Sequence, residues 1–587
     1  MRHRSLVRAA AAAIAAALAL SACASQSGDP GAGDGTGSPA ASGGAIRVAE
    51  TNAFTSFNTS HANTNLDINS KIVGLTRSGF TYIDPELNLV HDDSFGTMEK
   101  ISDSPLTVKY TIKDGVNWSD GNPVDKGDML LQWAILSGHF DAPGEDAKPK
   151  FFQYAGSTDG LNLTAKPTFE NDRTMTLVYS EPYVDWEIAF DMNLGTAAQP
   201  AHVVAKRAGL ADEAALVSLL ESATPAQANE QLAAVAKVWG EDFTTKTLPS
   251  DPEMYLSNGP MIVSQMEQDQ SVTLKRNEAY TGNRAAKVDE ITVRFIGDAA
   301  AQIAALRNGE VDVIAPQATT DTVEQVKGLQ GVNVLEGSQL AYDHVDLSFD
   351  SDVFKDANVR KAFMMTIPRQ QIVDRLIKPM YPQAEVVNSQ LYLPSEGEAY
   401  TKAVEANGSA PYHDVNIEEA KKLLAGKTPT VRILYNNGNP IRVDAYSMIA
   451  QSASQAGFRV QDMGSADWSQ KLGDGTYDAS LFGWVNPGVG NAGIPQLYSS
   501  TGGGNYGKYR SAEVDALAKS LLTEIDPAKV DDIKRQIDKH LWDDGFGATL
   551  FQSPGIVGVS DQVGGLDVYM PNQTGVWWNF WEWTVKS

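Results

Sequence analysis

The sequence predicts an α/β protein, in which strands and helices alternate along most of the chain. Three observations indicate this class. Short segments with alternating polar and apolar residues, rich in β-branched side chains, recur between residues 45 and 484. Segments rich in Ala, Leu and Glu, with the spacing of amphipathic helices, lie between them. Asp-Gly and Asn-Gly pairs mark turns at several of the boundaries.

The expected elements follow one another in a regular order. The segments with a strand pattern are 45–50, 106–113, 175–179, 262–276, 287–295, 311–314, 431–435, 458–461 and 479–484. The segments with a helical pattern are 125–136, 209–241 with a break at Pro225, 299–306, 358–362, 417–424, 445–456, 513–522 and 527–542. The aromatic run 577–583 predicts a further strand with one buried face, and stacking of these rings on a sugar is the alternative.

Composition limits the function. The 587 residues are 42% hydrophobic, which is enough for three or four structural units. A net charge of −26 argues against nucleic acid and anionic membrane surfaces as partners. A single cysteine, Cys23, excludes an intrachain disulfide and cysteine-rich metal sites, and the eight histidines lack metal-ligand spacing. We therefore expect no metal and no cofactor.

The N-terminus has the pattern of a lipoprotein signal peptide, 1–22. Three arginines precede an apolar run that is too short to span a membrane, and Leu20-Ser21-Ala22-Cys23 resembles a bacterial lipobox. An ordinary secretory signal is the alternative. Residues 23–44 are rich in Gly and Ser and predict a flexible tether. We expect a lipid on Cys23 to hold the protein on the outer face of the cytoplasmic membrane.

Several motifs in the rest of the chain resemble one family. In order they are 110–121 (YTIKDGVNWSDG) with 125–129, then 258–260, 274–277 and 288–291, then 299–312, then 358–362, then 419–424, and finally 477–481 with 483–484. Their order is similar to that of the family 5 extracellular solute-binding proteins, the peptide- and nickel-type receptors of ABC importers. The motifs cover nearly the whole chain after the tether.

The resemblance implies a periplasmic-binding-protein-like clamp of the large, three-subdomain type. One lobe would comprise 45–316 and 549–587, with a subdomain near 76–171, and the other lobe would comprise 317–548. Two hinge crossings are expected, near Ala315-Pro316 and near Phe551. The solute would bind between the lobes, and closure would give the importer a surface that differs from that of the empty receptor.

Two charged residues and one glycine motif are assigned to structure rather than to a site. We expect Asp312 and Arg360 to form ion pairs that maintain the fold. The motif Gly488–Gly493 matches GxGxxG, but a dinucleotide site needs a helix to open there. Pro495 and the glycine-rich sequence after it predict a loop instead.

The candidate solute-binding residues lie at predicted strand ends and in the loop after the first strand. They are Trp484, Asn486, Tyr435, Asn436, Asn437, Phe57 and Tyr342. Peptide-binding relatives carry an aspartate two or three residues after the equivalent of Trp484, which pairs with the peptide's α-ammonium group. This chain has Asn486 and Pro487 there, so the usual anchor is missing, unless another acid such as Asp343 reaches the same place.

The sequence thus predicts a lipid-anchored substrate-binding protein of an ABC importer, monomeric and not an enzyme. Its solute would be oligopeptide-like or another medium-sized organic molecule, and its partners would be the importer's permease subunits. Two alternatives remain, an oligosaccharide receptor of the same family and an envelope lipoprotein that has lost transport. A secreted hydrolase is a third class, but no catalytic motif supports it.

Overall fold

The structure is a computed structural model that describes residues 43–586 except 144–146, 194–196 and 487–488. The predicted signal peptide and Cys23 lie outside the described residues, as does the tether up to residue 42. The described residues belong to one compact unit. Strands and helices alternate within it, which confirms the α/β class.

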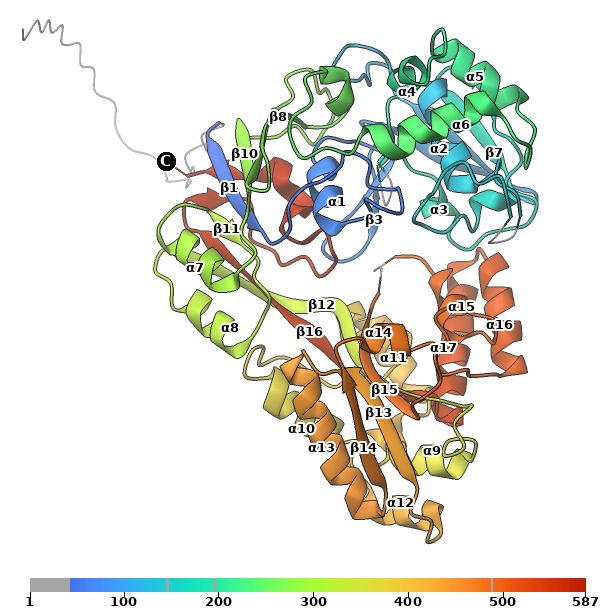
Figure 1. Ribbon diagram of the computed structural model, residues 1–587, viewed down its shortest axis with the longest axis vertical. Coiled ribbons are helices and arrows are strands. Elements are labelled where there is room, and N and C mark those ends of the chain that lie inside the picture. The colour runs from blue at the N-terminus through green and yellow to red at the C-terminus, as the bar shows by residue number, and fades with distance from the viewer. Residues whose placement is uncertain (1–42, 144–146, 194–196, 487–488, 587) are drawn as a thin grey trace, which may run out of the picture. The chain divides into compact units, whose positions relative to one another are not determined.

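A mixed sheet of ten strands runs through this unit (Figure 1). Its strands are β1 (Ala45–Glu50), β8 (Met261–Glu267), β9 (Ser271–Arg276), β10 (Glu290–Phe295), β11 (Val313–Ile314), β12 (Val332–Leu347), β13 (Thr430–Asn436), β14 (Arg459–Ser465), β15 (Ala479–Val485) and β16 (Gly547–Ser560). Their order is β14-β13-β15-β12-β16-β11-β1-β10-β9-β8. β1 is parallel to both of its neighbours, whereas β12 is antiparallel to β15 and to β16.

The long strands β12 and β16 connect two parts of this sheet. Figure 1 shows them running from the part that holds β1 and β11 to the part that holds β13 and β15. Their pairing shifts in register between Ser338 and Tyr342 and again between Asp343 and His344. Ala315 and Pro316 follow β11 directly, and Phe551 lies within β16. The division into lobes at residues 316 and 549 stays a prediction.

Smaller sheets complete the strand content. The first has four strands in the order β4-β5-β7-β6, namely β4 (Gly96–Asp103), β5 (Leu106–Ile112), β6 (Thr168–Asn171) and β7 (Thr174–Val178). Two-stranded pairs are formed by β2 (Thr81–Ile83) with β3 (Leu89–His91) and by β17 (Val563–Gly564) with β18 (Thr584–Val585).

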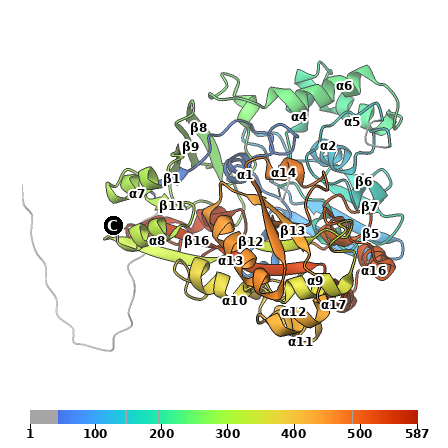
Figure 2. The same ribbon diagram turned by 60° about the horizontal axis from the view of Figure 1, so that its bottom comes forward.

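Helices pack against these sheets. They are α1 (Asp67–Gly74), α2 (Lys126–Ser137), α3 (Trp186–Ala189), α4 (Ala201–Arg207), α5 (Glu213–Ser222), α6 (Glu230–Lys237), α7 (Ala299–Arg307), α8 (Thr320–Lys327), α9 (Ala357–Met364), α10 (Arg369–Ile372), α11 (Glu398–Ala406), α12 (Ile417–Leu424), α13 (Pro440–Ala456), α14 (Trp468–Lys471), α15 (Gly493–Tyr498), α16 (Ala512–Thr523) and α17 (Pro527–Asp544). Figure 2 shows α4, α5 and α6 grouped beside α2. α2 begins at a reciprocal capping box between Asp125 and Asp128 and ends at Gly138, whose left-handed backbone suits glycine.

Two local predictions are wrong. The aromatic run expected as a strand forms a 3-10 helix, Gly575–Glu582. The loop expected after Gly493 is the short helix α15. Pro495 is compatible with this helix because it lies in the first turn, where the missing N–H group has no intrahelical partner to lose.

The two charged residues assigned to structure do have structural roles. Asp312 accepts hydrogen bonds from the guanidinium of Arg47 at 2.8 and 3.0 Å and from its backbone N–H at 2.7 Å, which ties β11 to β1. Arg360 donates instead to the carbonyls of Phe354 at 2.6 Å and Asp544 at 3.0 Å. The ion pair is therefore confirmed for Asp312, whereas Arg360 acts by binding carbonyl groups.

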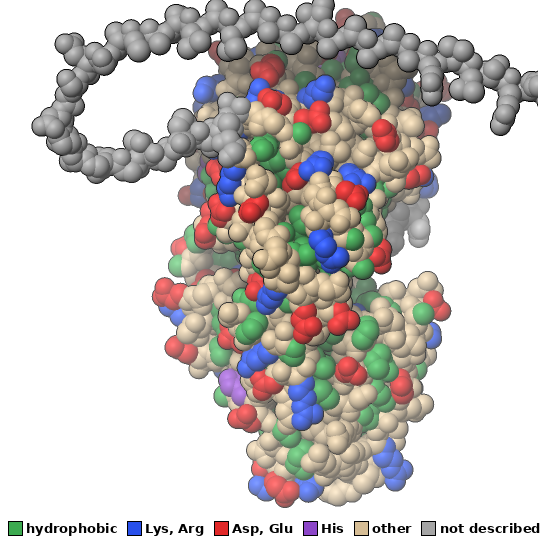
Figure 3. Space-filling view, turned by 90° about the vertical axis from the view of Figure 1, so that its left-hand side faces the viewer, with side chains coloured by type: hydrophobic (Ala, Val, Ile, Leu, Met, Phe, Trp, Pro, Cys, Tyr) green, Lys and Arg blue, Asp and Glu red, His purple; other side chains and the backbone are tan. Residues whose placement is uncertain are grey.

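Charged side chains of both signs are dispersed over one face of the molecule (Figure 3). In the part of the chain that the structure describes, no helix is long and apolar enough to cross a membrane. No cluster of His, Cys, Asp and Glu that could hold a metal ion occurs there either.

An acidic group between α2 and α5 makes stability depend on pH. Burial raises the pKa of Asp128 to about 7, although the backbone N–H of Ala201 and the indole N–H of Trp118 donate to it. Burial and the neighbouring Asp128 and Asp125 raise the pKa of Glu213 to about 9. A carboxyl group with a raised pKa holds its proton more tightly in the folded state. Its contribution is fully present below its ordinary pKa of 4.5 and is lost as pH rises through the raised value.

We expect Glu213→Gln to remove the contribution of Glu213 to this pH dependence and to leave that of Asp128, because glutamine mimics the protonated acid. The variant should match the wild type in melting temperature near pH 5 and exceed it near pH 9. Calorimetric melting at both pH values tests this, with Glu230→Gln on α6 as the control. Equal melting temperatures of variant and wild type at pH 9 would contradict the assignment.

Candidate functional site

Two adjoining cavities lie beside the long strands. The larger has a volume of about 790 Å³ and the smaller about 390 Å³. Five residues line both of them, namely Asp67, Lys71, Val485, Asn572 and Gln573. The two cavities therefore share one wall, and their volumes are typical of sites for small organic molecules.

Helix α1 supplies one wall of the larger cavity. Its residues Asp67, Ser70, Lys71 and Gly74 line the cavity, whereas the opposite face, centred on Ile72, is buried in the core. This is the i, i+3, i+4, i+7 spacing of one helix face. The amphipathic pattern of α1 thus places a basic and an acidic side chain at the junction of the cavities.

The C-terminal 3-10 helix supplies an aromatic wall. Trp577, Phe580 and Trp583 are largely buried, whereas Trp578 and Trp581 are more accessible, and all of these rings except Trp583 line the larger cavity. A 3-10 helix has three residues per turn, so residues three apart share a face. The strand expected for this run would have separated the residues by alternation instead. Trp577 and Phe580 also line the cavity, so the wall takes rings from both sets.

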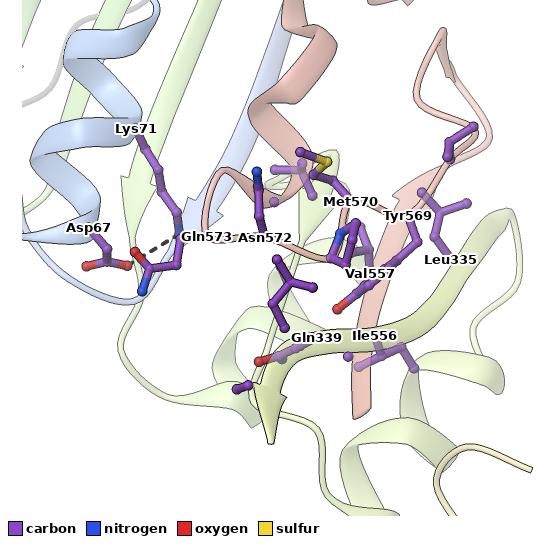
Figure 4. Close-up of a pocket in the computed structure, with 18 of the residues that line it drawn as sticks. Asp67, Lys71, Leu335, Gln339, Ile556, Val557, Tyr569, Met570, Asn572 and Gln573 are labelled. Atoms are coloured by element: carbon purple, nitrogen blue, oxygen red, sulfur yellow. Dashed lines mark ion pairs between the residues drawn. The ribbon is translucent and has the colours of Figure 1, made fainter. Parts of the chain in front are cut away.

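The smaller cavity has a mixed lining in which apolar side chains are the more numerous. It lies between β12, β16 and residues 566–576, and Figure 4 shows Leu335, Ile556 and Tyr569 away from the charged pair of Asp67 and Lys71. Val485, at the shared wall, is 51% exposed despite its apolar side chain. Exposed apolar surface inside a cavity favours a ligand with an apolar group.

Lys71 and Glu50 form a partly buried ion pair at the cavity wall. The ammonium of Lys71 lies 3.0 Å from Glu50 Oε2 and 3.4 Å from Asp67 Oδ2. The indole N–H of Trp577 donates to Glu50 Oε1 at 2.7 Å. Burial alone would lower the pKa of Lys71, but the two carboxylates outweigh it and raise this pKa. Glu50 thus ties β1 to both α1 and the 3-10 helix.

Arg284 is the third charged residue of the lining. Its guanidinium pairs with the buried carboxylate of Asp92 at 3.0 Å. It also lies over the rings of Tyr82 and Trp581, 5.2 and 5.3 Å from their centres. Among the residues described for both cavities, every charged side chain is therefore already paired within the protein.

Of the seven candidate residues from the sequence, Asn486 lines a cavity. Its backbone N–H donates to the carbonyl oxygen of Leu340 at 3.0 Å, which fixes Asn486 to β12. Trp484 is two residues earlier in the chain, and its ring lies parallel to those of His344 and Tyr506. Side chains alternate along a strand, so Val485 and Trp484 point to opposite faces, and Val485 is the one that lines the cavities.

The other five candidates are not among the residues that line either cavity. Tyr342 and Phe57 are buried in separate apolar clusters. Tyr435 is buried and stacks on Tyr446, with ring centres 4.8 Å apart. Asn436 accepts a hydrogen bond from the N–H of Gly438, and Asn437 is exposed. A role for these residues in binding a solute stays a prediction.

The alternative acid, Asp343, has a partner inside the protein. The guanidinium of Arg442 binds both of its oxygens, at 2.8 and 2.9 Å.

Four residues of the shared wall were not expected from the sequence, namely Asp67, Lys71, Asn572 and Gln573. Of these, Asp67 and Lys71 could have been recognised, because their i, i+4 spacing places them on one face of a helix. The tryptophans of the C-terminal run were noted, but with the wrong periodicity.

Comparison with known proteins gives consistent matches. The model of the family described as bacterial extracellular solute-binding proteins, family 5, matches residues 93–506. An uncharacterized lipoprotein of Mycobacterium tuberculosis is 26% identical over 525 residues, which are 87% of each chain. The oligopeptide-binding protein OppA of Mycobacterium bovis is 24% identical over 541 residues, covering 88% of this chain and 81% of OppA.

Solved structures share the fold. The periplasmic EDTA-binding protein EppA has a TM-score of 0.76 at 21% identity, covering 93% of this chain and 97% of EppA. The oligopeptide-binding protein AppA of Bacillus subtilis, solved with a nonapeptide, has a TM-score of 0.66 at 19% identity, covering 93% and 100%.

We expect Trp577→Phe to destabilise the protein, because it keeps a packed ring but leaves the buried Oε1 of Glu50 without its indole donor. The free energy of unfolding should fall by about 1–3 kcal/mol. Trp578→Phe is a matched control, since the buried indole N–H of Trp578 has no hydrogen-bond partner among the described residues. Urea denaturation of both variants gives the comparison, and equal losses would argue against a special role of Glu50.

Proposed function

Because the chain belongs to the bacterial extracellular solute-binding proteins of family 5, we propose that it is the substrate-binding protein of an ABC importer. A lipid on Cys23 anchors it to the outer face of the cytoplasmic membrane. It captures an oligopeptide-like or other medium-sized organic solute between two lobes and delivers it to the permease subunits. It acts as a monomer and catalyses no reaction.

The shared wall of the two cavities carries this proposal. The lining combines residues from the first 300 positions, such as Lys71 and Arg284, with Val485 and Asn486 and with the C-terminal residues 566–581. These segments belong to both predicted lobes, so a solute in the cavities contacts both. Binding of this kind favours the closed arrangement over the open one.

The chemistry of the lining supports a solute with neutral polar ends and apolar groups. Amides of Asn65, Asn193, Asn486, Asn572 and Gln573 can donate and accept hydrogen bonds. The charged side chains are paired within the protein, so a free ammonium group gains no unpaired carboxylate there. N-blocked or cyclic peptides suit such a site better than peptides that need their α-ammonium recognised.

An oligosaccharide is the second candidate solute, supported by the aromatic wall. Tyr82, Trp578 and Trp581 line the larger cavity together with the amides of Asn65 and Asn193. Rings that stack on sugar faces and amides that bind hydroxyl groups are the usual elements of saccharide sites. A lipoprotein without transport is the remaining alternative, and it predicts empty cavities in protein taken from its own host.

We expect native mass spectrometry of the protein purified from its own host to show a bound solute without a free amine. Asn486→Ala should lower the loaded fraction, since one lost hydrogen bond of about 1 kcal/mol weakens binding about fivefold. Asn437→Ala is the matched control, because this exposed asparagine lies outside both cavities. Protein that is always empty, or a solute held equally by both variants, would contradict the proposal.

We expect Cys23→Ala to release the protein from the membrane or to leave its signal peptide uncleaved. Two or more acyl chains hold a protein stably on a bilayer, whereas one chain binds only marginally, so the change should be nearly complete. Membrane fractionation with immunoblotting measures it, with Ser21→Ala as the control. A Cys23→Ala protein that is cleaved and still sediments with membranes would show that another anchor exists.

A further inference from the structure

Asp185 is a buried carboxylate that receives hydrogen bonds from a distant part of the chain. It lies just before α3 and is 8% exposed. The backbone N–H of Asn491 lies 2.8 and 2.7 Å from its two oxygens, and the backbone N–H of Ala492 lies 2.7 Å from Oδ2. The side-chain amide of Asn491 adds a bond of 3.2 Å. Three donor groups from residues 491–492 therefore converge on one side chain.

The backbone on both sides is shaped for this contact. Gly490 has φ +93°, a region that favours glycine, and a Cβ atom there would lie 2.9 Å from Ile188 Cδ1. A second backbone link lies next to Asp185, where the N–H of Val184 donates to the carbonyl of Leu522 at 2.9 Å. Residues 184–188 are thus fixed to two separate segments, the turn before α15 and the end of α16.

The contact lies beside the larger cavity. Ile188, three residues after Asp185, lines this cavity. Asn486 and Val489, shortly before the bonded turn, line it as well. Any displacement of the turn from Asp185 would move these side chains, and the wall between residues 188 and 489 would open.

We propose that Asp185 is a latch that holds residues 490–492 against residues 184–188 and so positions one wall of the solute cavity. In the predicted division, Asp185 belongs to the first lobe and residues 490–492 to the second. The inference deepens the proposed function and rests on it for the meaning of the cavity. The latch itself needs no solute, because all of its donors and acceptors belong to the chain.

The latch can be tested without knowing the solute. Cys23 is the only cysteine in the sequence, so a Cys23→Ser chain accepts labels at chosen sites. We choose two exposed positions, one in each predicted lobe, for the substitutions Ala165→Cys and Ala516→Cys. Spin labels on these cysteines allow their distance to be measured by pulsed electron paramagnetic resonance. A second pair, Ala165→Cys with Ala211→Cys, stays within the first lobe and reports on loss of fold.

Asp185→Asn should shift the 165–516 distances toward longer values, with roughly a tenfold change in the ratio of short to long populations. Asparagine keeps the size but loses the charge and offers one acceptor oxygen instead of two. Asp159→Asn is the matched control, an exposed aspartate in the same region. The 165–211 distances should not change in either variant.

A second variant approaches the latch from the other side. Ala492→Pro removes one donor to Asp185, and the backbone φ of −63° at this position suits proline. It should shift the distances in the same direction, and combining it with Asp185→Asn should add little. Unchanged distances in Asp185→Asn, or independent and additive shifts of the two variants, would overturn the latch. The proposed function would survive that result, because it depends on the cavities and their solute.

Discussion

The carboxylate of Glu50 joins three segments that are far apart in the sequence. It ends β1, accepts the indole N–H of Trp577 and pairs with the ammonium of Lys71. The wall of the larger cavity depends on this arrangement, since α1 and the aromatic helix meet the first strand there. If Glu50 lost either partner, its buried carboxylate would keep the cost of desolvation without the compensating interaction. This cost opposes separation of the three segments, in addition to the attraction between the paired groups.

Much of the fold could be predicted from local patterns. The strand at 45–50 was expected with the bounds that β1 has, because alternation of side chains is a local property. The prediction of a strand for 577–583 was wrong because the five aromatic side chains of this run are compatible with both the period of a strand and that of a 3-10 helix. Packing against Glu50 and the core selects the second, and that information lies more than 500 positions away.

The site was less predictable than the fold for the same reason. Asn486 lines the larger cavity, whereas Trp484 does not line either cavity and its neighbour Val485 lines both. A role for Trp484 in binding a solute stays a prediction. Asp185 has no local signal at all, since its partners are 306 and 307 residues away. The charges of the cavity are likewise defined by partners from other elements, as Arg284 is by Asp92. The described charged side chains of the lining thus have their partners within the protein.

The ladder between β12 and β16 has a mechanical consequence. A ribbon of hydrogen-bonded strands resists sliding, because every ladder bond would have to break together, but it twists with little cost. Register shifts between Ser338 and Tyr342 and between Asp343 and His344 interrupt the ladder, and irregular pairing of this kind increases the local bend and twist of a strand. We therefore expect the parts on either side to move more readily by twisting about this ribbon than by sliding along it. The stiffness comes from backbone bonds rather than from side-chain charges, so it is insensitive to ionic strength.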